Sequence, residues 1–475
     1  MTTTTLSQAG IEQAEPKRWL MLGILLSGIF LAPLDFFIIN VALPPIGHGL
    51  QASPGQLQLT IAAFSISYAV FLITGGRLGD FYGRRRLFLA GLLVFIASSA
   101  FCGFSTSPEM LIVGRALQGL SAAAMVPQGI ATIHVIFPDG EKLKALGFYG
   151  ATYGLASAIG QVVGGILISA NIMGLGWRLI FLINIPVGIV VFVAGLFLLK
   201  DSRDTKPIQF DWIGVFMLAV ALLSLTVPLS IGPGVGWPAW TIALMLLFPV
   251  IAIVFLWYEN RLSRYGNPIL NPAAFQSPTA RLGLTIALLF YAIAAFFLIY
   301  SVYLQSALHK SALEAGLLFS PFGLGFLVAT LMPASLKERV KVNMLSLGLL
   351  LEVIGLLWLS GAITRLSAEA SLFNGLYVMP PIFVMGIGLG FALPSLLKEI
   401  IVKTDPQYAG LVSGVINSSL QISAALGVAG IGSVFYVFSG DNTNYTMIAT
   451  SFSISLMLIA LCLTVASFLV ALMKK

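Results

Sequence analysis

Long apolar runs alternate with short polar segments along the whole chain. Fourteen such runs lie near 19–41, 57–76, 87–105, 110–134, 145–169, 177–199, 212–230, 239–258, 282–304, 315–335, 343–362, 376–397, 409–436 and 447–473. A helix of about 18 to 25 apolar residues spans the hydrocarbon core of a bilayer. The pattern therefore predicts an all-α polytopic membrane protein with 14 transmembrane helices, and an even number of spans places both chain ends on one side.

The positions of lysine and arginine support this arrangement. If both termini are cytoplasmic, the outer segments hold only Arg178, Lys310 and Arg365, and Arg115 falls within a helix. Every other lysine and arginine then lies in a cytoplasmic segment. This asymmetry is what the positive-inside rule requires, so we expect a multi-pass protein with cytoplasmic N- and C-termini.

Composition narrows the class of function. The chain is 58% hydrophobic and only 9% charged, so it cannot be a soluble domain, and its net charge of +7 follows from the loops rather than from a nucleic-acid site. Its histidines lie at helix ends or in loops, and no phosphate-binding G-x-x-x-x-G-K-[ST] motif occurs. We therefore expect no metal, no cofactor and no ATP-driven chemistry.

An internal repeat divides the chain. Three residues of one helix recur in the same order and spacing in a later one, as Gly150, Gly154 and Gln161 and as Gly410, Gly414 and Gln421. Two parallel six-helix halves, with a substrate site between them, are the expected result. We expect a cytoplasmic tail at 1–18, an N-terminal half at 19–199, a linker with an extra transmembrane hairpin at 200–281 and a C-terminal half at 282–475.

Several motifs carry a family resemblance. They are LDFFIINVALP (34–44), GGRLGDFYGRRR (75–86), RALQGLSAAAMVP (115–127), WRLIFLINIPVG (177–188) and YLQSALHKSALEAGLLFSP (303–321). Over residues 19–436 the chain resembles the fourteen-helix drug:proton antiporter branch of the major facilitator superfamily, a group of multidrug efflux transporters. The resemblance implies the major facilitator fold, with two six-helix halves and a two-helix central hairpin.

The same resemblance implies a function. The chain would be a proton-coupled secondary transporter, not an enzyme, that works as a monomer in the bacterial plasma (inner) membrane. It would export lipophilic, often cationic drugs or antiseptics by alternating access, with protons, substrate and lipid as its partners. One departure leaves an alternative open: Gln161 stands where the branch usually has proline. A dedicated exporter or a symporter of a single metabolite is that alternative.

The charged loop at 75–86 is a candidate cytoplasmic gate. Its matching residues are Gly76, Asp80, Gly83, Arg84 and Arg85. Glycine allows a tight turn at the bilayer surface, and Asp80 is placed to cap the positive N-terminus of the helix at 409–436. We expect that contact to act as a latch, although a solvated loop whose arginines only set the topology is the alternative.

Asp35 and Arg115 are the candidate proton-coupling residues. A carboxylate in hydrocarbon is costly, so Asp35 is expected to face a sheltered cavity, and Pro33 breaks the helix backbone beside it. Arg115 would control how readily Asp35 holds a proton. The alternatives are that Asp35 is solvated near the outer surface and that Arg115 extends to the outer headgroups.

Other polar residues fall within the predicted spans. Five lie on helices that should line the cavity, where they would bind substrate or join helices: Asn40, Gln118, Gln161, Asn417 and Gln421. Glu352 lies in the middle of a peripheral span. It is protonated, paired against the central hairpin or functional, and the sequence leaves these three alternatives open.

Overall fold

All fourteen predicted spans are helical in the computed structural model, which describes residues 17–202, 210–275, 277–332, 342–366, 374–404, 409–439 and 445–473. No strand occurs in these residues. The elements are α1 (Arg18–Leu50), α2 (Pro54–Tyr82), α3 (Arg84–Gly103), α4 (Pro108–Ile136), α5 (Asp139–Ala170), η1 (Ile172–Gly174), η2 (Gly176–Arg178), α6 (Leu179–Leu182), α7 (Asn184–Leu198), α8 (Trp212–Val235), α9 (Ala239–Leu262), η3 (Pro272–Phe275), α10 (Pro278–Phe290), η4 (Tyr291–Ile293), α11 (Ala294–Val302), η5 (Tyr303–Ala307), α12 (Ala312–Leu331), α14 (Met344–Leu366), α15 (Gly375–Val402), α16 (Ala409–Ser439) and α17 (Tyr445–Leu472).

The membrane-spanning prediction is confirmed by these 14 long apolar helices. Most of them extend several residues beyond the apolar runs, because polar residues continue the first and last turns. Of the predicted tail at 1–18, only Lys17 and Arg18 belong to the described residues, and residues 203–209 and 276 of the predicted linker lie outside them.

Serine residues fix where two helices begin. Ser53 Oγ accepts a hydrogen bond from the Gln56 backbone N–H at 3.3 Å, and Gln56 Oε1 accepts from the Ser53 N–H at 2.8 Å. Ser311 and Glu314 form the same capping box at the start of α12. Each box satisfies two amide donors that the first helical turn leaves unpaired. The second helices of the two predicted halves, α2 and α12, therefore begin in the same way.

Glycine brings the same pairs of helices together in both parts of the chain. A Cβ at Gly119 on α4 would lie 2.2 Å from the carbonyl oxygen of Phe64 on α2. A Cβ at Gly386 on α15 would lie 2.0 Å from the carbonyl oxygen of Phe322 on α12. These distances leave no room for a side chain, so glycine is required at both positions. The matched packing supports the predicted repeat.

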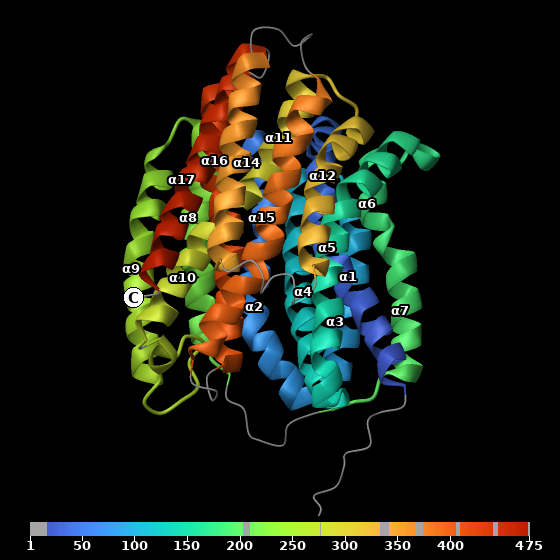
Figure 1. The fold of residues 1–475 in the computed structure, drawn as a ribbon, viewed down its shortest axis with the longest axis vertical. Coiled ribbons are helices and arrows are strands. Elements are labelled where there is room, and N and C mark those ends of the chain that lie inside the picture. The colour runs from blue at the N-terminus through green and yellow to red at the C-terminus, as the bar shows by residue number, and fades with distance from the viewer. Residues whose placement is uncertain are drawn as a thin grey trace, which may run out of the picture.

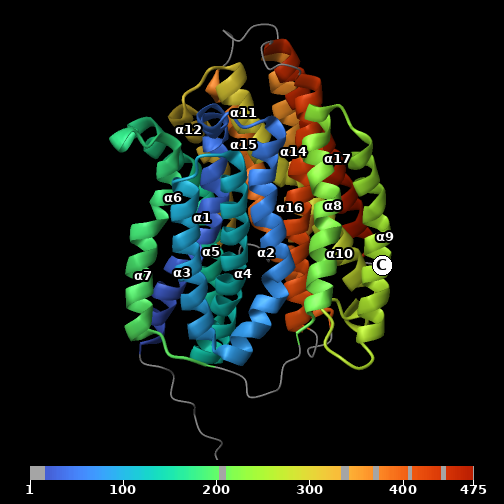
Figure 2. The same cartoon turned by 180° about the vertical axis from the view of Figure 1, so that it is seen from behind.

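Two helix pairs join the first and last parts of the chain. The α5 helix packs along α12, and α2 packs along α16, as the two opposite views show (Figures 1 and 2). Two of the repeated glycines lie in these contacts, because Gly154 faces Phe326 of α12 and Gly414 faces Ile73 of α2. A substrate site between the two predicted halves would therefore lie between these two helix pairs.

The extra hairpin, α8 and α9, lies at one side of the bundle, where α8 packs against α2 and α16 (Figure 2). At the end of the hairpin where α8 begins and α9 ends, polar side chains form several hydrogen bonds. Asp211 Oδ1 accepts from Tyr258 Oη at 3.0 Å, and Glu259 Oε2 accepts from the Leu270 N–H at 2.7 Å. Arg77 of α2 donates to two backbone carbonyls in the loop before α10. These bonds attach the hairpin to the loop before α10, and that loop to the end of α2.

Candidate functional site

Asp35 and Arg115 form an ion pair inside the first part of the bundle. Asp35 comes from α1 and Arg115 from α4, and both side chains are 0% exposed. Arg115 Nη1 donates to Asp35 Oδ2. Asp35 Oδ1 accepts from Gln118 Nε2 at 3.1 Å and from Asn184 Nδ2 at 3.2 Å. A buried ion pair persists only when further hydrogen bonds satisfy its remaining oxygens, and the two amides supply them.

Arg115 is bonded on several sides. Its Nε donates to the Thr60 carbonyl oxygen at 3.2 Å, and its Nη1 donates to Gln118 Oε1 at 2.8 Å. The guanidinium carbon lies 4.6 Å from the centre of the Phe64 ring. Only Nη2 lacks a hydrogen-bond partner among the described residues. The arginine therefore links the acid on α1 to an aromatic side chain on α2.

We call Asp35, Ser99, Arg115, Gln118 and Asn184 the polar cluster. Gln118 Nε2 also donates to Ser99 Oγ of α3 at 3.0 Å, so the cluster joins α1, α3, α4 and α7. Sequence reasoning found three of its members and missed Ser99 and Asn184. Asn184 could have been identified from the sequence, because it is the polar residue in the INIP segment of an apolar run. Ser99 could not, because serine is common inside membrane helices.

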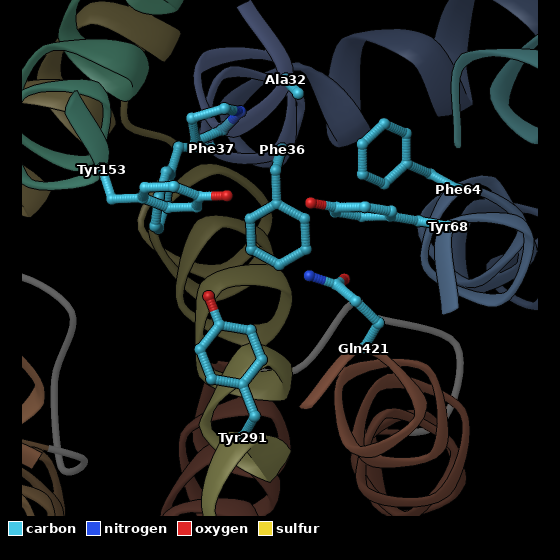
Figure 3. Close-up of a pocket in the computed structure, with 9 residues that line it drawn as sticks. Ala32, Phe36, Phe37, Phe64, Tyr68, Tyr153, Tyr291 and Gln421 are labelled. Carbon is cyan, nitrogen blue, oxygen red and sulfur yellow. The ribbon is translucent and has the colours of Figure 1, made fainter. Parts of the chain in front are cut away.

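A small cavity lies about halfway along the bundle, and we call it the central cavity. Helices α1, α2 and α5 line one side of it, while η4 and α16 line the other (Figure 3). The lining residues are Ala32, Pro33, Phe36, Phe37, Phe64, Tyr68, Tyr153, Tyr291 and Gln421. Neither Asp nor Glu is among them. Phe64 both lines the cavity and carries Arg115 against its ring, so it connects the cavity to the polar cluster.

Aromatic side chains close the bundle on the side of the α1–α2 turn. Phe37 of α1 and Phe297 of α11 have ring centres 5.4 Å apart, and Phe297 is 5.3 Å from Phe322 of α12. We call these three rings the aromatic seal. Near the same end, Gln305 Nε2 donates to the Val41 carbonyl oxygen at 2.9 Å. The first and last parts of the chain are therefore in contact at this end.

The other cavity candidates lie in different surroundings. Only Gln421 lines the central cavity, and Gln118 belongs to the polar cluster. Asn40 Nδ2 donates to the Phe36 carbonyl oxygen at 2.9 Å, and Asn417 Nδ2 donates to that of Ser413 at 2.8 Å, so each is bonded to its own helix. Gln161 is buried where α5 meets α12.

The candidate gate is held by local bonds. Asp80 Oδ1 pairs with Arg84 Nη2 at 2.8 Å, and Arg84 Nη1 also donates to the carbonyl oxygen of Ala131 on α4. Arg85 donates its backbone N–H to Asp201 at 3.2 Å. The predicted loop is wrong in extent, because α2 continues to Tyr82 and α3 begins at Arg84, so only Gly83 makes the turn, at φ 105°, a conformation that favours glycine. Gly76 lies within α2 and faces Pro127 of α4. The proposed contact between Asp80 and the start of α16 stays a prediction, since residues 405–408 lie outside the described part of the chain.

Glu352 is buried between helices. It lies on α14, which packs against α15 and α17, and its side chain faces Gly388 of α15. Within the described residues, neither carboxyl oxygen has a hydrogen-bond partner. Because an unpaired buried charge is very costly, the neutral, protonated form is the one that fits this position.

Comparison with known proteins supports the fold and the class. Residues 25–428 match the model of the family described as Major Facilitator Superfamily. The chain is 33% identical to the "Probable actinorhodin transporter" of Streptomyces coelicolor, covering 90% of this chain and 74% of that one. It is 30% identical to the multidrug resistance protein Stp of Mycobacterium tuberculosis, over 86% and 74%. The structure of the POT family transporter PepTSo matches with a TM-score of 0.67 at 15% identity, over 96% and 98%.

Proposed function

The chain belongs to the Major Facilitator Superfamily, and we propose that it is a proton-coupled transporter that exports drug-like molecules by alternating access. It is a membrane transporter and not an enzyme. Relatives named for antibiotic transport and multidrug resistance support a drug-like substrate. The proposed location is the bacterial plasma membrane with both termini in the cytoplasm, which the distribution of lysine and arginine favours. We propose that a single chain suffices.

The buried Asp35–Arg115 pair is the observation that carries proton coupling. Protonation of Asp35 would remove the charge that holds Arg115 Nη1 and would release the guanidinium. Because the guanidinium lies against Phe64, its movement would change one wall of the central cavity. Proton binding and substrate binding would then influence each other. Each proton that enters gains roughly 2.3 kcal/mol per 100 mV of membrane potential, which is enough to drive useful accumulation.

The decisive experiment neutralises both members of the pair. Asp35→Asn alone leaves Arg115 buried without its counter-charge, a defect that typically costs about 3–5 kcal/mol. The double variant Asp35→Asn/Arg115→Gln avoids this defect. We expect it to fold and to exchange substrate across vesicle membranes, but to lose accumulation driven by a proton gradient in everted vesicles.

The matched control is an exposed pair. Lys310 Nζ and Glu314 Oε1 lie 3.4 Å apart at the start of α12, and Lys310→Gln/Glu314→Gln should retain gradient-driven transport. Unchanged dependence on the proton gradient in the Asp35/Arg115 double variant would remove the pair from the coupling mechanism.

A further inference from the structure

We propose that the central cavity selects uncharged, planar aromatic molecules that carry hydrogen-bonding groups at their edges, and that it discriminates against cations. This inference rests on the proposed function, because it names the substrate class of the same cavity. It departs from the expectation of cationic substrates that the family resemblance raised. Three features of the lining carry it: its ring content, its polar groups and its lack of a negative charge.

The first feature is the aromatic lining. Six of the nine lining residues are Phe or Tyr. Phe36 stands in the middle, with Tyr291 nearly parallel to it at 6.2 Å and an interplanar angle of 29° (Figure 3). Flat aromatic ligands gain most from such surfaces, because ring–ring contacts add to the free energy of apolar burial. A planar molecule that inserts beside Phe36 would replace these contacts with its own.

The second feature is a set of neutral polar groups directed into the cavity. The hydroxyl groups of Tyr68 and Tyr153 point toward each other across Phe36, and that of Tyr291 points toward the same space (Figure 3). Gln421 adds an amide whose nitrogen points toward Phe36, while its buried Oε1 has no hydrogen-bond partner in the described part of the chain (Figure 3). A buried acceptor without a partner is costly, so a ligand donor there is favoured. Phenols, quinones and amides offer matching edges.

The third feature is charge. None of the nine lining residues is Asp or Glu, and the nearby Asp35 carboxylate is already bonded to Arg115, Gln118 and Asn184. A cation moved from water into this cavity would lose its hydration without gaining a counter-charge. Ring faces can attract cations. One face of Phe64, however, is already occupied by the Arg115 guanidinium and is not available to a second cation.

Binding to the purified full-length protein tests this selectivity with two planar probes of three fused rings. The neutral probe is 1,8-dihydroxyanthraquinone, and the cationic probe is 10-methylacridinium, which also has three fused rings. We expect the neutral probe to bind at least tenfold more tightly, as followed by quenching of its fluorescence or of the protein's tryptophan fluorescence. Equal or tighter binding of the cation, or binding of neither probe, would overturn the proposal.

Variants of the lining then assign the selectivity to named groups. Tyr68→Phe and Tyr153→Phe keep the rings and remove the hydroxyls, and each should weaken the neutral probe about two- to tenfold. The matched control is Tyr258→Phe, which removes a hydroxyl in the hairpin and should leave binding unchanged. Gln421→Glu places a carboxyl group in the cavity whose ionised form a bound cation would stabilise, and we expect it to reverse the preference in favour of 10-methylacridinium. Failure of these variants to alter the ratio would contradict the assignment.

This experiment separates the inference from the proposed function. Probe binding requires no proton gradient, so loss of coupling in the Asp35/Arg115 variant leaves the selectivity measurement intact. If the cation binds better while gradient-driven transport persists, only the substrate class is wrong. If the neutral probe binds selectively but no proton-driven transport occurs, only the proposed coupling is wrong.

Discussion

At the scale of single residues, the arrangement around Asp35 shows how a charge is kept inside the bilayer. Asp35 Oδ2 accepts a hydrogen bond from Arg115, and Asp35 Oδ1 accepts hydrogen bonds from the side-chain amides of Gln118 and Asn184. The amides come from different helices, so the carboxylate also fixes how α4 and α7 lie against α1. A group that serves both charge and packing should be sensitive to the loss of any one donor.

Asn184→Leu is the corresponding prediction. The substitution removes one donor to Asp35 and leaves part of the carboxylate unsatisfied, so we expect a loss of about 1–3 kcal/mol in stability. Heating of the detergent-purified protein should show a lower unfolding temperature. Asn417→Leu is the control, because Asn417 bonds only to the Ser413 carbonyl of its own helix and is part-buried. Equal stability of the two variants would contradict the role assigned to Asn184.

The pairing of Asp35 with Arg115 could be predicted from sequence, because charges inside apolar runs must find partners. The hydrogen-bond partners of the uncharged polar residues could not be predicted from sequence in this way. Asn40 and Asn417 share the composition of cavity residues, yet both donate to the preceding turn of their own helices. Whether an amide bonds locally or across helices depends on helix rotation, which residue type alone does not determine.

At the scale of helices, close approach is set by glycine. Gly119 and Gly386 occupy equivalent contacts in the α2–α4 and α12–α15 pairs, and in each a backbone carbonyl of the partner helix fills the space of a side chain. The positions of the helices could be predicted from the lengths of the apolar runs, because a helix must be long and apolar enough to span the bilayer core. The repeat pairs Gly119 with Gly386, each eight residues before a proline, but it does not show that these two of the 48 glycines make the close contacts, because glycine is abundant along the chain.

Substitution by alanine should distinguish these glycines from the others. Gly119→Ala and Gly386→Ala would each force two helices apart, and we expect both to lower stability and expression by similar amounts, on the order of 1–3 kcal/mol. Gly361→Ala is the control, since nothing lies within 4 Å of the new methyl group, and alanine is the better helix former there. Limited proteolysis and thermal unfolding in detergent measure the difference. Tolerance of alanine at both contact positions would show that the helices are less tightly packed than described.

At the scale of the whole molecule, the structure is closed on the side of the α1–α2 turn. The aromatic seal and the Gln305–Val41 hydrogen bond join the first and last parts of the chain there. The cavity lies below this closure, and its lining comes from five separate elements (Figure 3). Because of the internal repeat, a cavity between the two halves could be predicted from the sequence. The sequence could not predict Tyr68, Tyr153 and Tyr291, because tyrosine is also common in lipid-facing and packing positions.

Alternating access requires this closure to open during each cycle, and a reversible cross-link tests that requirement. At the same end the Ser433 and Gln58 side chains are in contact at 3.2 Å, so Gln58→Cys and Ser433→Cys, in a background with Cys102→Ser and Cys462→Ser, place two thiols together on α2 and α16. A short, reducible thiol cross-linker should abolish gradient-driven transport, and reduction should restore it. Substrate binding should persist, because the opposite end stays free to open.

The control cross-link lies within one predicted half. Arg18 Nε of α1 and Glu141 Oε2 of α5 are 2.7 Å apart, so Arg18→Cys/Glu141→Cys accepts the same reagent. Both helices belong to the predicted N-terminal half and would move together as the two halves rock. We therefore expect this cross-link to leave transport unchanged. Normal transport with positions 58 and 433 joined would mean that this end need not open, and alternating access between the two predicted halves would have to be abandoned.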